Sequence, residues 1–233
     1  MIFTMTLLSL AISLPVCLAS DKGEVFGATG GMLVIGLLLF CWGLLCRNND
    51  RYKVFMLPAI VIGIVSTTVA LYLNSFLEFG DEMASDMFKF FESESPTIII
   101  GVGAYIIAIA MVPFAIFQIR NNMALKLITI PMVAALLLVA VPGYVDNVAL
   151  VVIANILFLV LASVLIWSAR LLEDRRLFWS GVLITAAFVV SRALEYETGL
   201  LIKSAAFTAC GIGVMVTGVM FEKYLKNRRA SYE

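Results

Sequence analysis

The sequence predicts an all-α integral membrane protein: a bundle of seven transmembrane helices after a signal-like N-terminal apolar segment, or eight if that segment is retained. Three observations predict this class. The 233-residue chain is 62% hydrophobic and 14% charged, whereas a soluble domain is about one-quarter charged. Its apolar residues fall into runs long enough to cross a bilayer, which takes about 20 residues. Basic residues collect in every second gap between these runs, as the positive-inside rule expects.

Residues 1–20 form the first apolar segment, and two interpretations of it stay open. Cys17 and Ala19 are small residues that suit a signal-peptide cleavage site, and Pro15 would break a helix just before that site. The basic residues expected at the start of a signal peptide are missing, which favours a retained first helix. In either case we expect one polytopic domain over 24–226 and a cytoplasmic tail over 227–233.

Seven further apolar runs follow, and each is expected to be helical because lipid offers no hydrogen-bond partner to an unpaired backbone. Short connections between the runs make consecutive helices antiparallel neighbours. The expected spans are 27–46, 54–76, 97–119, 124–142, 147–169, 177–195 and 199–222.

The long connection is residues 77–95. Within it we predict a short amphipathic helix near 80–93, lying on the outer interface, because its Met and Phe residues share one broad helical face. Ser95 and Pro96 then suit the N-cap and the first position of the next helix. The interfacial helix is expected to brace the bundle; the alternative is a docking surface for an extracytoplasmic partner.

The basic residues also predict the orientation of the chain. Twelve of the sixteen lie in four alternate gaps, and that side is predicted to be cytoplasmic. Residues 77–95 are then outside, and the C-terminus is in the cytoplasm of a bacterial inner membrane. The twelve are Arg47, Arg51, Lys53, Arg120, Lys126, Arg170, Arg175, Arg176, Lys223, Lys226, Arg228 and Arg229.

Small residues predict where helices touch, because they let backbones approach closely in lipid. Gly36 and Gly43 lie seven apart in the first span after residue 25. In the last span Ala205, Ala209 and Gly213 recur every fourth position, and a second series of Ser204, Gly211 and Gly218 recurs every seventh. Packing within the chain is the expected role, with a homo-oligomer through the last helix as the alternative.

Four charged residues predict a polar cluster at the outer face. Arg192 and Glu195 are three apart and so share a helical face, Glu197 lies in the following turn, and Lys203 lies one turn into the last span. We expect Arg192 to pair with Glu195 or Glu197 and to clamp the outer ends of the last two helices. The alternative is a site for an anionic or zwitterionic solute, since charges inside lipid prompt a functional hypothesis.

Few residues of the sequence could bind a cofactor or metal or act in catalysis. The sequence has no histidine and no C-x-x-C motif, so we expect no cofactor, no metal site of the His type and no catalytic residues. Zero net charge predicts no nucleic-acid partner. The polar residues inside the spans are expected to bond a neighbouring helix or their own backbone. They are Ser66, Thr67, Thr68, Thr129, Asn155, Ser163 and Thr185.

The C-terminal third resembles a known family. Asn155, the run Arg175-Arg176-Leu177-Phe178-Trp179-Ser180-Gly181, Arg192 and the pattern from Leu200 to Gly211 carry the resemblance over 147–230. They are similar to the end of a large bacterial family of multi-pass membrane proteins described only as domains of unknown function. This chain departs from the longer members, which have more helices and often a soluble N-terminal part. The resemblance implies location and fold rather than activity.

These observations predict a non-enzymatic membrane protein, a structural or accessory subunit that works through helix packing and partner docking. Its expected partners are the lipid bilayer, a membrane or extracytoplasmic protein, and a second copy of the chain. The alternative is a transporter or channel for a small solute or ion, which would need a site near the middle of the membrane.

Overall fold

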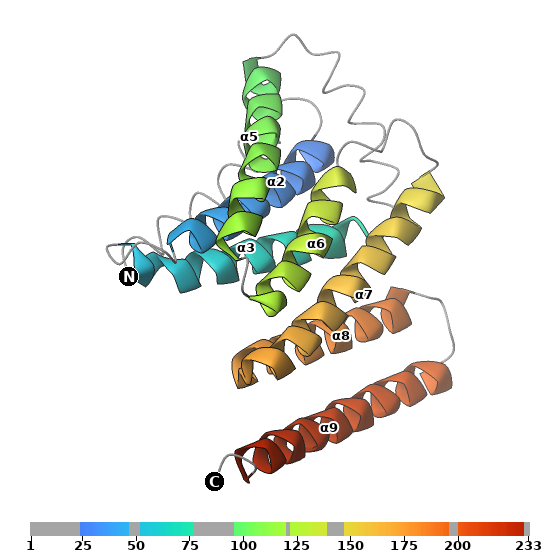
Figure 1. The fold of residues 1–233 in the computed structure, drawn as a ribbon. Helices are drawn as coiled ribbons and strands as arrows, with labels where there is room; N and C mark the ends of the chain where they lie inside the picture. Colours follow the sequence, from blue (N-terminus) through green and yellow to red (C-terminus); the bar gives the residue numbers. More distant parts are fainter. Residues whose placement is uncertain are drawn as a thin grey trace. The chain divides into compact units, whose positions relative to one another are not determined.

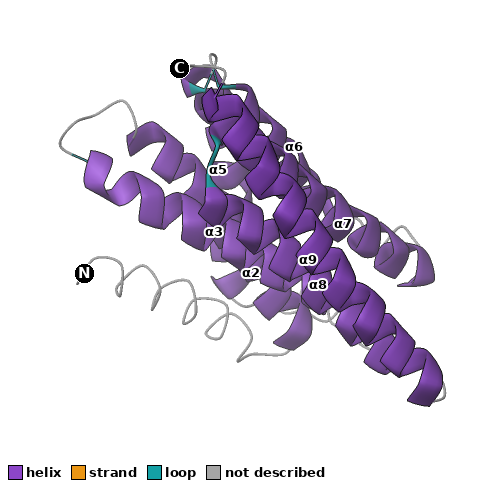
Figure 2. Cartoon of the chain, turned by 90° about the horizontal axis from the view of Figure 1, so that it is seen from below, coloured by secondary structure: helices purple, strands orange, loops and turns teal. Residues whose placement is uncertain are grey.

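The structure is a computed structural model that describes residues 24–46, 52–76, 96–119, 122–138, 147–195 and 200–230. Within these ranges the fold is helical, with seven helices and no strand (Figure 1, Figure 2). The helices are α2 (Glu24–Cys46), α3 (Lys53–Leu73), α5 (Pro96–Gln118), α6 (Met123–Leu137), α7 (Asn147–Leu172), α8 (Arg175–Glu195) and α9 (Leu200–Ala230).

Five of these helices, α2, α3, α7, α8 and α9, are long and apolar enough to cross a membrane. The apolar part of α5 covers Val102–Phe117, and α6 covers Met123–Leu137. The 15 residues of α6 rise only about 22 Å, against about 30 Å of hydrocarbon. The chain is therefore a membrane-embedded helical protein, and five of its described helices have the length and composition of membrane spans.

Several predicted features lie outside the described residues. They are the segment 1–20, the interfacial helix near 80–93, the end of the expected span 124–142, and Glu197. At the other end of the chain, α9 continues beyond the expected span limit at 222 and through the start of the expected tail at 227, as far as Ala230. Helix-favouring Lys and Arg residues extend the helix past its apolar part.

The chain forms two compact units, residues 1–158 and 159–233, and the boundary falls inside α7. In the first unit α2 packs against α3, α5 and α6. Gly36 and Gly63 lie where α2 and α3 approach each other closely. A Cβ added at Gly63 would lie 2.6 Å from the carbonyl oxygen of Gly36, and one at Gly43 would lie 2.8 Å from Ile60. The prediction that Gly36 and Gly43 mark a helix contact is confirmed.

In the second unit the contact of α8 with α9 is built on aromatic rings. Phe178 of α8 stacks on Phe221 of α9 with 3.8 Å between ring centroids, and both are buried. Val182 and Leu225 complete this core with Ala169 of α7. These side chains determine which face of α9 meets α8.

The small residues of α9 do not meet α8 as one stripe. Ala205, Ala209 and Gly213 are exposed within the second unit, and a Cβ added at Gly213 would meet nothing within 4 Å. In the second series, a Cβ added at Gly218 would lie 2.8 Å from the Trp179 ring, whereas one added at Gly211 would meet nothing within 4 Å. Within the second unit the Gly213 stripe has no packing partner, and its expected packing within the chain stays a prediction. The bulky rings of α8 select a different face of α9.

Candidate functional site

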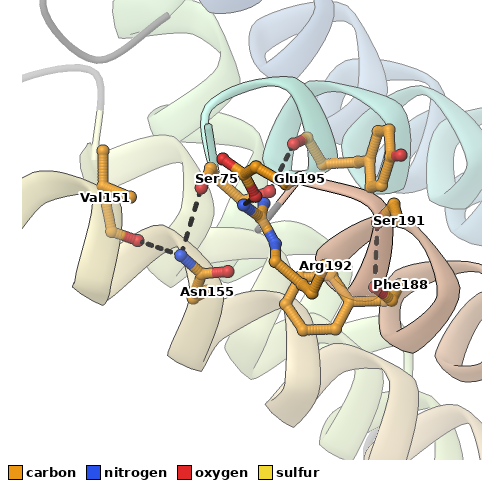
Figure 3. A network of polar contacts seen from close by, with 8 residues as sticks. Ser75, Val151, Asn155, Phe188, Ser191, Arg192 and Glu195 are labelled. Atoms are coloured by element: carbon orange, nitrogen blue, oxygen red, sulfur yellow. Dashed lines mark hydrogen bonds and ion pairs between the residues drawn. The ribbon is translucent and has the colours of Figure 1, made fainter. Parts of the chain in front are cut away.

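The polar cluster that the sequence predicts at the outer face is centred on the last turn of α8. The guanidinium of Arg192 donates from Nη1 to Oε2 of Glu195 in an ion pair between residues three apart (Figure 3). The two side chains are only 17% and 29% exposed. Water therefore screens this pair less than it screens a surface pair.

The position of Arg192 has local causes in α8. It lies in the last turn of the helix, where the partial negative charge of the helix C-terminus favours a cation. Its guanidinium also lies 5.2 Å from the centroid of the Phe188 ring, close enough for a cation–π contact. Ser191 donates to the backbone oxygen of Phe188 at 2.8 Å. Arg192 is thus oriented by an acid, a ring and the end of its own helix.

The structure brings together two of the four predicted cluster residues. Glu197 lies outside the described residues, and Lys203 is partly buried on α9. Among the described residues no ion pair joins Lys203 to Glu195. The ion pair of Arg192 with Glu195 lies within α8, and the clamp between α8 and α9 stays a prediction.

A second polar group, which the sequence did not single out, lies at the C-terminal end of α3. Asn74 and Ser75 are both fully buried. Asn155 of α7 donates from Nδ2 to the backbone oxygen of Ser75 at 3.2 Å and to that of Val151 at 2.8 Å (Figure 3). Asn155 thus bonds both a distant element and its own helix, as expected for a polar residue inside a span.

Asn74 is the unusual member of this group. Its carboxamide is buried, yet neither Oδ1 nor Nδ2 makes a hydrogen bond within the described part of the chain. Leaving a buried polar group unsatisfied costs about 1–3 kcal/mol. Its backbone N–H bonds the oxygen of Ala70 and caps α3. In the sequence, an Asn at the end of an apolar run signals only this capping role.

Hydroxyl groups inside the spans bond the backbone. Ser66 donates across to the oxygen of Met32 at 2.9 Å, which ties α3 to α2. The threonines donate to the carbonyl four residues earlier in their own helix, as the sequence led us to expect. They are Thr67, Thr68, Thr129 and Thr185, with distances of 2.8 to 3.0 Å.

No protein-family model, curated protein or solved structure matches this chain. The resemblance of residues 147–230 to a family of membrane proteins of unknown function stays a prediction. Site chemistry therefore rests on the described residues alone. Among them, no three or more Cys, Asp or Glu residues are grouped in a way that could hold a metal ion.

Proposed function

We propose that this chain is a non-enzymatic multi-pass protein of the bacterial cytoplasmic membrane, a structural or accessory subunit that acts through helix packing and partner docking. The observation that carries the proposal is the exposure of α9. Only about 11% of its apolar stretch is buried, and α8 is the helix on which it packs most extensively. Within the second unit, this helix of 31 residues thus leaves most of its surface uncovered by α8.

The exposed surface of α9 is not uniform. One flank carries Ala205, Ala209 and Gly213, all exposed, at every fourth position. A lipid-facing surface has no need of small side chains, whereas a contact between helices in lipid does, because close approach of the backbones supplies the packing energy. The proposed partner of this flank is another transmembrane helix, either from a second copy of the chain or from a different membrane protein.

Gly213→Leu is expected to abolish this association and to leave the purified protein melting at or slightly above the wild-type temperature, because a Cβ at Gly213 meets nothing in the second unit and leucine is favoured over glycine inside a helix. Co-purification of a tagged chain with an untagged copy, and with other membrane proteins, measures the association. Gly211→Leu is the matched control, since Gly211 also has open space around it but lies on the other flank of α9. A lower melting temperature for Gly213→Leu would mean that the stripe contacts the rest of its own chain.

The proposed orientation places the C-terminus and the four basic gaps in the cytoplasm, and residues 77–95 outside. Its support is the distribution of Lys and Arg along the chain. A phosphatase fused after Glu233 is expected to be inactive, because that enzyme needs the oxidising periplasm, and a fluorescent protein fused there is expected to fluoresce. An active phosphatase at this position would reverse the orientation of every span.

The second candidate is a transporter or channel for a small solute. The unsatisfied carboxamide of Asn74 favours it, because a bound polar solute would satisfy that group. Partial burial of the Arg192 ion pair also favours it, because ionisable groups inside a membrane protein commonly mark solute pathways. If Arg192 belongs to a solute site, its variants should keep full stability. If it belongs to a structural ion pair, as the subunit hypothesis holds, they should lose stability.

A further inference from the structure

At one end of the second unit, charged and aromatic residues from three helices lie together. Arg170 lies in the last turn of α7, Arg175 opens α8, and Glu222 and Tyr224 lie near the end of α9. Arg175 donates from Nη2 to Oε2 of Glu222 at 2.7 Å, which ties α8 to α9. The guanidinium of Arg170 lies 5.6 Å from the centroid of the Tyr224 ring, which ties α7 to α9. These two contacts hold the three helix ends together (Figure 1).

We call this surface the basic end and define it by Arg170, Arg175, Arg176, Lys223 and Lys226, all of which are exposed. Three acids, Glu173, Asp174 and Glu222, lie beside these five cations. Glu222 is already paired with Arg175. The carboxylate of Asp174 accepts from the backbone N–H of Arg176 at 2.8 Å and so caps the N-terminus of α8.

Three of the five cations have no acid partner. Among the described residues no ion pair joins Arg176, Lys223 or Lys226 to a carboxylate. Lys226 follows Glu222 by four residues, so it lies on the same face of α9, one turn further along. The ion pair of Arg175 with Glu222 joins the first turn of α8 to this part of α9, so Arg176 and Lys226 belong to the same end of the second unit.

Tryptophan side chains give the depth of the basic end in the membrane. Trp167 of α7 and Trp179 of α8 are 60% and 38% exposed, and exposed Trp favours the level of the lipid headgroups. Trp167 precedes Arg170 by three positions, and Trp179 follows Arg176 by three positions. Three helical positions are a rise of about 4.5 Å. The cations therefore lie at the depth of lipid phosphates. Further along α8 and α9, away from these cations, the surface carries exposed apolar side chains such as Leu183 and Val219.

We propose that the basic end binds an anionic phospholipid, with its phosphate against Arg176 and Lys226 and its acyl chains along the apolar faces of α8 and α9. The positive end of the α8 dipole adds to the attraction. Anionic lipid is enriched where the sequence predicts this end to lie, at the cytoplasmic leaflet. A zwitterionic lipid offers the same acyl chains, but its own cation opposes the charge of the basic end.

The test uses the full chain in neutral detergent, titrated with phosphatidylglycerol or phosphatidylcholine while its melting temperature is measured. We expect phosphatidylglycerol to raise the melting temperature at concentrations where phosphatidylcholine does not. Each Lys or Arg near a lipid surface contributes about fivefold in affinity. The double variant Arg176→Gln/Lys226→Gln should therefore need about 30-fold more phosphatidylglycerol for the same shift. Lys203→Gln, at the other end of the unit, should titrate like the wild type.

Charge-conserving Arg176→Lys/Lys226→Arg should restore the response, which separates loss of binding from loss of folding. Equal shifts with the two lipids would overturn the proposal, as would a double variant that keeps the wild-type titration. A third arm with inorganic phosphate or glycerol phosphate in place of lipid distinguishes the sources of the anion. If the soluble anion raised the melting temperature as much as phosphatidylglycerol does, the basic end would be a site for a soluble anion. That result would also overturn the proposal of a bound lipid.

Discussion

Gly63→Leu should separate α2 from α3 and destabilise the first unit. A Cβ at Gly63 would lie 2.6 Å from the carbonyl oxygen of Gly36 and 2.8 Å from the backbone nitrogen of Phe40. Backbone atoms cannot rotate away as a flexible side chain can, so the two helices themselves must move. Overpacking of a close-packed core costs about 1–3 kcal/mol, occasionally more, and we expect the upper end here.

Gly103→Leu is the matched control for Gly63→Leu. Gly103 is also a helical glycine of the first unit, in α5, but a Cβ there would meet nothing within 4 Å. Glycine is disfavoured inside a helix by about 0.8–1 kcal/mol relative to alanine, and leucine ranks only slightly below alanine, so this variant should melt at or slightly above the wild-type temperature. Both variants gain the same helix propensity, and only Gly63→Leu adds a steric clash with the backbone of α2. Equal melting temperatures for the two would contradict the close contact of α2 with α3.

Arg192→Ala should be the most harmful substitution of a charged residue in the second unit. It leaves Glu195 partly buried without its ion-pair partner, at a helix end where a negative charge is unfavourable. Removing one partner of a buried pair costs about 3–5 kcal/mol. Because both side chains keep some exposure, we expect a loss at or just below the lower end of that range, measured by thermal melting in detergent.

Arg175→Ala is the matched control for Arg192→Ala. Arg175 makes the same kind of ion pair, with Glu222, but these side chains are 55% and 46% exposed. An exposed pair contributes about 0–1 kcal/mol, so this variant should melt close to the wild type. The difference between the two arginine variants measures what burial adds to an ion pair in this protein.

A double-mutant cycle on Arg192 and Glu195 separates a structural pair from a solute site. For a structural pair, the double variant should lose less stability than the sum of the single variants, with a coupling of about 0.5–3 kcal/mol. For a solute site, all three variants should keep the wild-type melting temperature. Strict additivity with unchanged stability would therefore favour the transporter over the structural subunit.

The helices and the pair at Arg192 follow from local features of the sequence. Each of the seven described helices overlaps a run expected from hydropathy, because a segment in lipid must satisfy its backbone within itself and helix formation is then a local matter. The spacing of Arg192 and Glu195 is also local, since residues three apart share a helical face whatever surrounds them. Gly36 and Gly43 belong to the same class, because small residues permit a close contact wherever it forms.

Only the tertiary structure decided which faces meet. In a soluble helix the apolar side identifies the buried face, but α9 is apolar on nearly every side, so its pattern cannot say whether Gly213 or Gly218 meets α8. The rings of Phe178 and Trp179, which pack against Phe221 and over Gly218, determine which face of α9 meets α8. Likewise, Asn155 reaches Ser75 across 80 positions of sequence, and Arg175 meets Glu222 across 47. Such contacts depend on the distance and rotation of neighbouring helices, which side-chain packing determines and sequence spacing does not record.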